Sequence, residues 1–427
     1  MTAMTAARDH LDDLAQFVVA SPTSFHAAVE GARRLADAGF VRQEETAEWD
    51  TSPGGHYLVR DGALLAWRLP DGAGPGTAFR IVGSHTDSPT FRLKPRPDLT
   101  AAGWQQLGLE IYGGPLLNSW LDRELGLAGQ LVLSDGSSKL VQTGALMRIP
   151  QLAIHLDRGV NDDGLKLDKQ VHTAPVWGVG PDERSVLAEV ANLAGCSPAE
   201  IDGCDLMAFD TAAPVVFGSR QEFFASGRLD NLGSVHASIT ALLASAGSEH
   251  IELVAAFDHE EVGSESRTGA SGPILADALT RILVGLGASP DEQYRSLARS
   301  VCLSADAGHA VHPNYPSRHD PVNRPLPNAG PLLKINANQR YATDARGAAT
   351  WRRACRTAGV GLQEFVSNNA LPCGSTIGPL TATRLGIATV DVGLPLLSMH
   401  SARELAGADD PLALTLAMAA FFGQDYP

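Results

Sequence analysis

The chain of 427 residues has few cysteines, few basic side chains and no long apolar run. Its five cysteines form no CxxC pair, which argues against a thiolate zinc site or a disulfide framework and indicates reduced thiols. Lys and Arg total 33 against 48 for Asp and Glu, and the net charge of −15 disfavours nucleic acid as a partner. The apolar run at 412–422 is too short to cross a bilayer, and no apolar signal segment opens the chain. We therefore expect a cytoplasmic protein with no membrane partner.

Strand and helix patterns alternate along most of the chain, which predicts an α/β fold. Strand patterns in these parts lie at 79–85, 251–257, 301–306 and 388–393. Between about residues 93 and 222 the pattern changes to short segments of alternating hydrophobicity, which are typical of a β-rich domain. We therefore expect an α/β domain of residues 1–92 and 223–427, interrupted by an inserted β-rich domain of residues 93–222.

Residues that commonly bind metal ions follow four of the strand-like segments and precede one predicted helix. They are His85 with Asp87, Glu260 with Glu261, Asp306, His400 and, just ahead of the helix, Asp230. Ligands of open α/β sheets bind beyond the carboxyl ends of the strands, so these side chains are expected to converge. Each also has a simpler interpretation by itself, such as a helix N-cap for Asp230 or a buried histidine for His85.

The two histidines and three of these carboxylates make up the ligand set expected for two divalent ions that share a bridging carboxylate. Residues two apart on a strand face the same way, so Asp87 is expected to orient the ring of His85. Glu260 and Glu261 would point to opposite sides of a regular strand, so one can bind metal while the other acts as a general base. A solvated acidic turn is the alternative for this pair.

Longer sequence blocks surround these residues. They are GSHTDSP at 83–89, SGRLDN at 226–231, FDHEEVGS at 257–264, SADAGHAVHPNY at 304–315, LKINANQRYAT at 333–343, PCGSTIGP at 372–379 and LSMHSARE at 397–404. In this order the blocks closely resemble the aspartyl aminopeptidase family of co-catalytic zinc exopeptidases. The resemblance implies a metallopeptidase α/β/α sheet domain that is interrupted by a β-rich dimerisation domain.

The resemblance also implies a set of metal ligands. It implies two Zn²⁺ ions in each subunit, with Asp230 as the bridging ligand. His85 and Glu261 are then expected on one ion, and Asp306 and His400 on the other. Carboxylate and imidazole ligands also accept Mn²⁺ or Co²⁺.

The mechanism that the resemblance implies begins with a bridging water, which Glu260 deprotonates. The water attacks a peptide carbonyl polarised by zinc, and Glu260 then passes the proton to the leaving amine. Asp87 is implied as the residue that orients His85. The expected substrates are peptides with a free N-terminus, from which single residues are removed.

Substrate preference and assembly are implied in the same way. Lys334 is expected to contact the acidic side chain of the first substrate residue, which predicts release of Asp or Glu, and a strand-end surface charge is its alternative. Tyr341 is expected to bind the substrate. His155 matches a family histidine that reaches the active site of the neighbouring subunit, and an ordinary partly buried histidine on a strand is its alternative. Dimers that build tetrahedral dodecamers are expected.

Two other functions remain open at this point. One is an aminopeptidase of broad or neutral-residue preference, or a deacylase that uses the same metal chemistry. The other is a catalytically silent shell-forming or cargo-binding protein. The complete ligand set together with Glu260 favours an enzyme.

Overall fold

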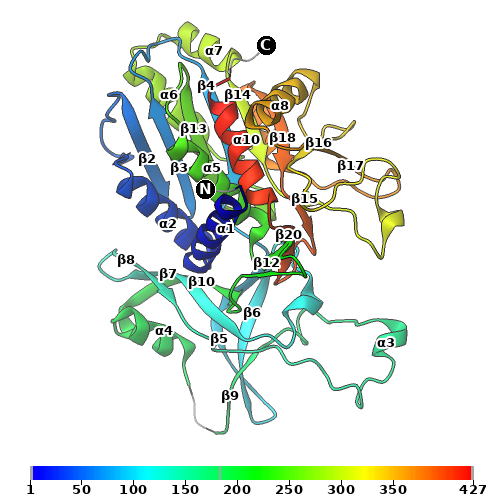
Figure 1. The fold of residues 1–427 in the computed structure, drawn as a ribbon. Coiled ribbons are helices and arrows are strands. Elements are labelled where there is room, and N and C mark those ends of the chain that lie inside the picture. The colour runs from blue at the N-terminus through cyan, green and yellow to red at the C-terminus, as the bar shows by residue number, and fades with distance from the viewer. Residues whose placement is uncertain (1–2, 182–183, 425–427) are drawn as a thin grey trace. The chain divides into compact units, whose positions relative to one another are not determined.

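The computed structural model describes residues 3–181 and 184–424, and the chain divides into two compact units (Figure 1). The first unit comprises Met1–Asp87, Pro214–Met399 and Glu404–Pro427, as far as these segments are described. The second unit comprises Ser88–Ala213 together with the short segment His400–Arg403.

A nine-stranded sheet forms the centre of the first unit. Its strands, in spatial order, are β1 (Val41–Arg42), β2 (Gly54–Arg60), β3 (Ala63–Leu69), β13 (Ile251–Phe257), β4 (Phe79–His85), β14 (Val301–Ala305), β18 (Ala388–Gly393), β16 (Leu332–Ile335) and β17 (Gln363–Val366). The central strands β13, β4, β14 and β18 run parallel to one another. Nearly all of their residues are buried, as expected for parallel strands that are covered on both faces.

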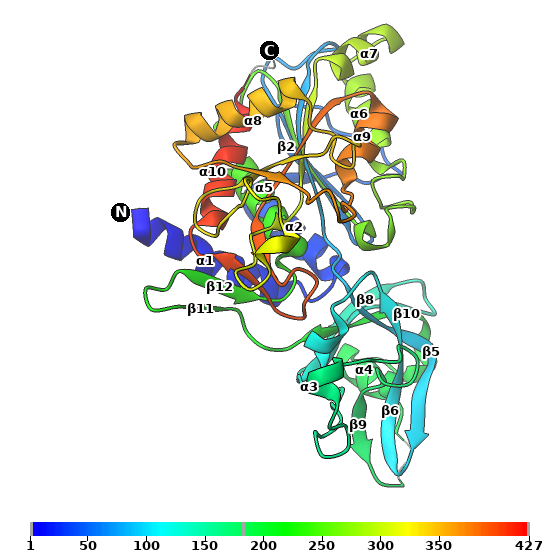
Figure 2. The ribbon, with the colours of Figure 1, turned by 90° about the vertical axis from the view of Figure 1, so that its right-hand side faces the viewer.

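Helices cover both faces of this sheet (Figure 2). On one face lie α1 (Ala3–Ala20), α2 (Ser24–Asp37), α5 (Leu229–Ala244), α8 (Ala345–Ala358) and α10 (Asp410–Phe422); on the other lie α6 (Ile274–Gly285), α7 (Pro290–Ala298) and α9 (Ile377–Leu385). The apolar side chains on the two faces form two separate core clusters, one around Phe17 and Phe421 and one around Trp67 and Phe79. The predicted α/β class is therefore confirmed, with an α/β/α arrangement.

The apolar run at the end of the chain forms most of α10. This helix packs against α1, α5 and α8, and its residues Leu414, Met418 and Phe421 are completely buried. Within the described ranges, none of the helices combines the length and the apolar character needed to span a membrane.

A second, smaller sheet of the first unit was not expected from the sequence. Its five strands are β11 (Val215–Phe217), β12 (Phe223–Ser226), β20 (Glu404–Gly407), β19 (Pro395–Leu397) and β15 (Gly308–His309). Strands of only two to four residues are too short for an alternating pattern to reveal them. The described part of the same unit also contains the 3₁₀ turns η3 (Glu260–Val262) and η4 (Pro316–Arg318).

The second unit contains an antiparallel six-stranded sheet. Its strands, in spatial order, are β8 (Ser138–Gln142), β7 (Leu125–Leu133), β10 (Ile201–Asp210), β5 (Thr90–Ala101), β6 (Trp104–Tyr112) and β9 (Val176–Val179). The helices and 3₁₀ turns of this unit are η1 (Leu117–Trp120), α3 (Val160–Asp163), α4 (Val186–Ala194) and η2 (Pro198–Glu200). Phe91, Leu127 and Val190 belong to its own hydrophobic core.

The boundaries of the two units differ from those expected from the sequence. The units part after Asp87 and Ala213, not after residues 92 and 222. The first boundary lies earlier because β5, which pairs with β6, already begins at Thr90. The second lies earlier because β11 pairs with β12 in the small sheet of the first unit.

Candidate metal centre

His85, the last residue of β4, lies at the centre of a cluster of carboxylates. The residue is only 1% exposed. Its Nε2 atom lies 3.3 Å from Oδ1 of Asp230, 3.5 Å from Oδ1 of Asp306 and 4.0 Å from Oε2 of Glu260. Because β4, β13 and β14 run parallel, their carboxyl ends bring His85, Asp306 and the turn that holds Glu260 to one edge of the sheet.

Asp87 connects His85 to the glutamate pair. The Nδ1 atom of His85 lies 3.0 Å from the main-chain oxygen of Asp87 and 3.4 Å from its Oδ1 atom. The Asp87 carboxylate also accepts hydrogen bonds from the main-chain N–H groups of Glu260 (3.0 Å) and Glu261 (3.1 Å). Asp87 therefore contacts both the imidazole ring and the turn of the two glutamates, and the sequence suggested only the first of these contacts.

Glu260 and Glu261 lie in the 3₁₀ turn η3 and not in a strand. The strand β13 ends at Phe257, and His259 has a φ of 64°, so the chain turns before it reaches the glutamates. The prediction that the pair points to opposite sides of a strand end is therefore wrong. One carboxylate oxygen of each glutamate and a ring nitrogen of His85 all lie within 4.8 Å of one another.

Asp230 lies at a break in the first turn of α5, where its φ of −83° and ψ of 100° are not helical. The N-cap of this helix is Arg228, so the N-cap interpretation of Asp230 does not hold. The Asp230 N–H donates to Oε2 of buried Glu404 at 2.9 Å, and Asn231 Nδ2 donates to the main-chain oxygen of Ala305 at 2.8 Å. Neither Glu404 nor Asn231 was given a role from the sequence, although both lie within the quoted blocks SGRLDN and LSMHSARE.

Lys334 on β16 is completely enclosed beside Asp306. Only 1% of the residue is exposed, so the interpretation as a surface charge is wrong. Its Nζ atom lies 2.9 Å from the main-chain oxygen of Ala307, and 3.1 and 3.4 Å from the main-chain oxygen and Oδ2 of Asp306. The same atom lies 4.9 Å from the ring centre of Tyr341. The ammonium thus contacts both the main chain at Asp306 and the ring of Tyr341, and its expected contact with a substrate side chain stays a prediction.

The electrostatics of the cluster favour added positive charge. Burial disfavours the cationic form of His85, but hydrogen bonds to Asp230, Asp306 and Asp87 outweigh burial and hold the pKa of His85 well above its usual value. Burial, together with the charges of the neighbouring carboxylates, raises the pKa of Glu260 to about 7, although His85 opposes this rise. Several buried carboxylates that face one imidazole are thus suited to a divalent cation.

The donor atoms fit zinc in type and in spacing. Zinc binds imidazole nitrogen and carboxylate oxygen at about 2.0 to 2.2 Å, which places neighbouring ligand atoms of a tetrahedral site about 3.3 to 3.6 Å apart. The 3.3 Å between Nε2 of His85 and Oδ1 of Asp230 agrees with this value. Potential ligand atoms also group as His85 with Asp230 and Asp306, and as His85 with Glu260 and Glu261. The first group places Asp306 beside His85, although the resemblance implied that these two residues bind different ions.

His400 does not end a strand of the large sheet, contrary to the expected pattern. It follows β19 and belongs, with the next three residues, to the second unit. Its Nδ1 atom lies 3.0 Å from the main-chain oxygen of Gly114, and its own main-chain oxygen accepts a hydrogen bond from Leu116 at 2.8 Å. Donation from Nδ1 to a carbonyl selects the tautomer in which Nε2 carries the lone pair, as is common for metal-binding histidines.

His155 is exposed and lies in a loop of the second unit, so its interpretation as a partly buried strand histidine is wrong. Its neighbours Leu152, Ile154 and Leu156 are also exposed, and Leu156 reaches 74%. Exposed apolar side chains that lie as close together in the sequence as these three are typical of a surface that another molecule covers.

A pocket of about 240 Å³ lies beside Tyr341 in the first unit. Tyr341, Phe365 and Leu371 form part of its apolar lining, and the exposed Arg318 lies at its edge. His309, three residues after the candidate ligand Asp306, lines the same pocket. The pocket therefore combines an apolar wall with a cationic edge close to the carboxylate cluster.

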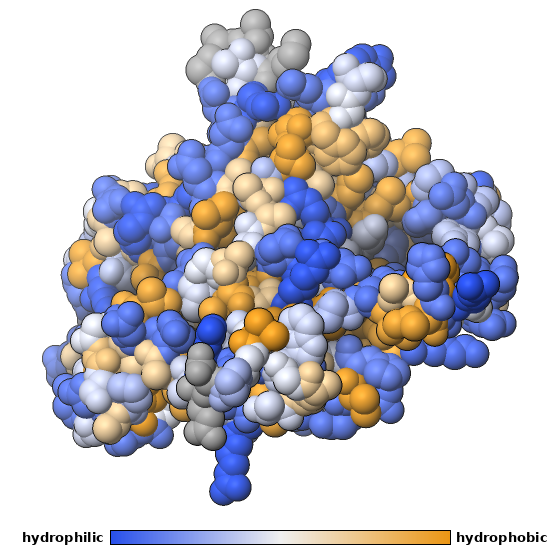
Figure 3. Space-filling model, turned by 90° about the horizontal axis from the view of Figure 1, so that it is seen from below, coloured by the Kyte–Doolittle hydropathy of each residue, from blue (hydrophilic) through white to orange (hydrophobic). Residues whose placement is uncertain are grey.

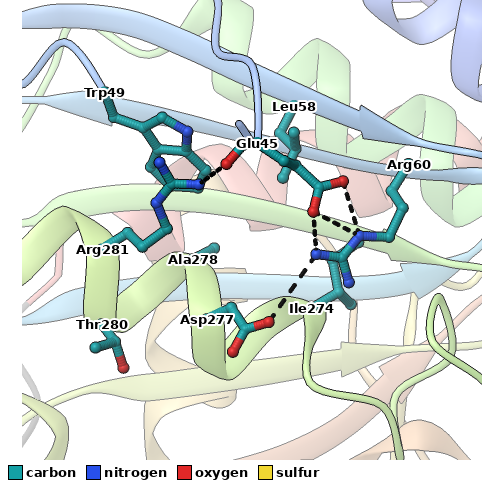
Figure 4. A pocket seen from close by; sticks show the side chains of 9 residues that line it. All are labelled: Glu45, Trp49, Leu58, Arg60, Ile274, Asp277, Ala278, Thr280 and Arg281. Carbon is teal, nitrogen blue, oxygen red and sulfur yellow. Dashed lines mark hydrogen bonds and ion pairs between the residues drawn. The ribbon is translucent and has the colours of Figure 1, made fainter. Parts of the chain in front are cut away.

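A second pocket, of about 350 Å³, lies between β2 and α6 (Figure 4). Its charged side chains bind one another. Arg60 pairs with Glu45 and lies 4.0 Å from Asp277, while the guanidinium of Arg281 lies 4.0 Å from the ring centre of Trp49. These contacts join the loop before β2 to α6 and favour a packing role for this pocket.

Comparisons with known proteins match almost the whole chain. The sequence profile of the family described as "Aminopeptidase I zinc metalloprotease (M18)" matches residues 17–422. A relative from Streptomyces avermitilis, named "Probable M18 family aminopeptidase 2", is 54% identical over 421 residues, which cover 97% of this chain and 98% of the relative. A chain in the "Cryo-EM structure of the Ape4 and Nbr1 complex" has a TM-score of 0.94 at 35% identity, covering 98% of this chain and 86% of that one. The S. cerevisiae mApe1 dodecamer has a TM-score of 0.84 at 30% identity, with 96% and 95% covered.

Proposed function

Because the chain belongs to the M18 family of zinc metallopeptidases and is an M18 aminopeptidase, we propose that it releases single Asp or Glu residues from the N-terminus of peptides. The observation that carries this proposal is the buried cluster at the end of β4, where the carboxylates of Asp230, Asp306 and Glu260 face Nε2 of His85. Such a donor set binds divalent metal ions, and its position at the carboxyl edge of a parallel sheet leaves it accessible to a ligand.

Five side chains are proposed to hold two zinc ions, namely His85, Asp230, Glu261, Asp306 and His400. The spacing of His85 and Asp230 and the tautomer selected at His400 support this assignment. Mn²⁺ or Co²⁺ would suit the same ligands. When bound, the zinc ions supply a Lewis acid that polarises the peptide carbonyl.

Glu260 is proposed as the general base. Its main chain is held by Asp87 in the turn η3, which places its carboxylate next to the proposed ligands. Glu260 takes a proton from the attacking water and then delivers it to the leaving amine, so that the peptide bond breaks without net consumption of the base. Asp87 orients the ring of His85 through Nδ1 and does not itself exchange protons with the substrate.

The preference for acidic residues is supported by the pocket beside Tyr341. A substrate whose N-terminus lies at the carboxylate cluster can place its first side chain in this pocket. The apolar wall of Tyr341 and Phe365 would hold the methylene groups, and the guanidinium of Arg318 would pair with the carboxylate. An aminopeptidase of neutral-residue preference is the second candidate, because the same wall also suits a Leu side chain.

The proposal predicts metal-dependent release led by acidic residues. Matched peptides that begin with Asp, Glu, Leu or Ala are incubated with the purified protein before chelation, after chelation and after zinc repletion. We expect release of Asp and Glu to exceed that of Leu and Ala, to disappear with chelation and to return with zinc. Release led by Leu or Ala would retain the metal site and discard the acidic preference. If no peptide were cleaved by zinc-loaded protein, the proposed reaction would be wrong.

We propose further that the chain assembles into dodecamers built from dimers, in which His155 reaches the active site of a neighbouring subunit. The solved mApe1 structure is described as a dodecamer, and the apolar side chains beside His155 are exposed in the single chain. Hydrophobic patches lie among hydrophilic residues on the face of the molecule seen in Figure 3.

This assembly predicts a mass in solution of about twelve times the 44.9 kDa of the chain, measured by light scattering. The variant His155→Ala should keep that mass and lose activity, because the loop would still pack but would no longer supply an imidazole. The matched control His172→Ala removes another exposed histidine of the second unit and should retain activity. A fully active monomer would contradict the role of His155.

A further inference from the structure

We infer that Glu404 is a positioning residue of the metal centre, which fixes the main chain of Asp230 so that the carboxylate of Asp230 can serve both zinc ions. The inference rests on the proposed function, and in particular on Asp230 as the bridging ligand. Glu404 is neither a proposed ligand nor a proposed proton carrier, so its role concerns the retention of metal.

The main-chain N–H of Asp230 lies where a helix supplies no acceptor of its own. Asp230 is the second residue of α5, and the first four N–H groups of a helix have no partner within that helix. The residue is only 4% exposed, and a buried N–H group needs an acceptor. The carboxylate of Glu404 accepts this N–H at 2.9 Å, although the two residues are 174 positions apart in the chain. Glu404 therefore satisfies a buried donor at the proposed bridging ligand.

This hydrogen bond acts at the point where α5 departs from helical geometry. Both Asp230 and the following Asn231 have φ and ψ values outside the helical region. The Asn231 side chain donates to the main-chain oxygen of Ala305, the last residue of β14, at 2.8 Å. The break is thus anchored twice, to Glu404 and to the end of β14. Two anchors at this break direct the Asp230 carboxylate toward His85, whose Nε2 atom lies 3.3 Å from Oδ1 of Asp230.

Glu404 is itself held in a fixed position. It begins β20, the middle strand of the five-stranded sheet, and pairs with Ser226 at the end of β12. The next residue, Leu405, pairs with Ala225 of β12 and with Leu397 of β19. Because α5 begins only three residues after β12 ends, this register brings the Glu404 side chain to the first turn of α5. Groups carried by paired strands position a neighbour more precisely than groups carried by loops.

A simpler role for Glu404 is that of an acceptor for the first turn of a helix, without any effect on metal. The second unit offers a matched example of that role. Oδ1 of Asp98 accepts the N–H of Val186, the first residue of α4, at 3.0 Å, and these two residues are also far apart in the chain. A comparison of the two acceptors therefore separates support of a helix from support of the metal centre.

The test is Glu404→Ala in the full-length, zinc-loaded protein, compared with the unsubstituted chain and with Glu261→Ala. Zinc per subunit is measured by mass spectrometry after equilibration with increasing concentrations of chelator. A bridging carboxylate binds both ions, so we expect the affinity for both zinc ions to fall by about tenfold in Glu404→Ala. Glu261→Ala, which removes a proposed ligand of one ion, should weaken one position only.

Two further variants separate this role from general destabilisation. Glu404→Gln keeps a side-chain oxygen that accepts the Asp230 N–H and removes only the charge, so it should retain zinc more tightly than Glu404→Ala. Asp98→Ala should leave zinc retention unchanged, even where its thermal melt shifts. If Glu404→Ala folds poorly in thermal melts, Glu404→Gln is compared with the unsubstituted chain, and a smaller loss at both zinc positions is expected.

Glu404→Ala protein that retains zinc as tightly as the unsubstituted chain overturns the inference. A loss confined to one of the two positions also overturns it, because Glu404 would then not act through a shared ligand. Equal losses in Glu404→Gln and Glu404→Ala have the same consequence, because the retained acceptor would have no effect. Absence of zinc binding by the unsubstituted chain would instead overturn the proposed function itself.

Discussion

The variant Glu260→Gln is expected to lose about 10²- to 10⁴-fold in kcat while it retains the zinc content of the unsubstituted protein. Glutamine has nearly the same shape and keeps an oxygen at this position, but it cannot accept a proton from water at neutral pH. The turn η3 should remain intact, because Asp87 holds the main-chain N–H of residue 260 and not its side chain. Single-turnover rates on an Asp peptide and zinc content by mass spectrometry check the two parts of this prediction.

The neighbouring variant Glu261→Ala is the matched control. It removes a proposed ligand from the same turn, so its activity loss should come with loss of zinc from one position. A Glu260→Gln protein with normal turnover would remove Glu260 from the proton transfer. Equal loss of zinc in the two variants would show that both glutamates are ligands.

The convergence of the site was predictable because it follows from strand direction. His85 and Asp306 directly end or follow parallel strands whose apolar runs are plain in the sequence, and parallel strands place their carboxyl ends at one edge. Hydrophobic pattern alone could thus identify these residues as neighbours. The four central parallel strands of the large sheet were predictable for the same reason.

What the sequence did not reveal depends on backbone geometry that has no periodic signal. The positive φ of His259 moves Glu260 and Glu261 out of the strand, and no pattern in the residues announces that turn. Lys334 was interpreted by its charge, but its burial follows from the pairing of β16 with β17 and β18, which local composition does not predict. The grouping of His400 with the second unit likewise rests on its hydrogen bonds to the segment around Gly114 and Leu116.

The other large effect is expected for Asp87→Ala. This change removes the acceptor of two main-chain N–H groups, those of Glu260 and Glu261, and leaves both donors in a partly buried region without that partner. It also removes the carboxylate oxygen that lies 3.4 Å from Nδ1 of His85. We expect about a 100-fold loss of activity, seen mainly in kcat, because the general base and a proposed ligand are both displaced.

The series Asp87→Asn and Asp168→Asn tests whether this loss comes from the two hydrogen bonds. Asparagine keeps one side-chain acceptor at position 87, so its loss should be smaller than that of alanine. In the second unit, Oδ1 of Asp168 likewise accepts from two successive main-chain N–H groups, those of Gln170 and Val171. Replacement of Asp168 should leave activity unchanged, since no proposed catalytic group lies in the turn that Asp168 holds. If Asp87→Ala raised KM at constant kcat, Asp87 would serve substrate binding and the turn η3 would be held by other contacts.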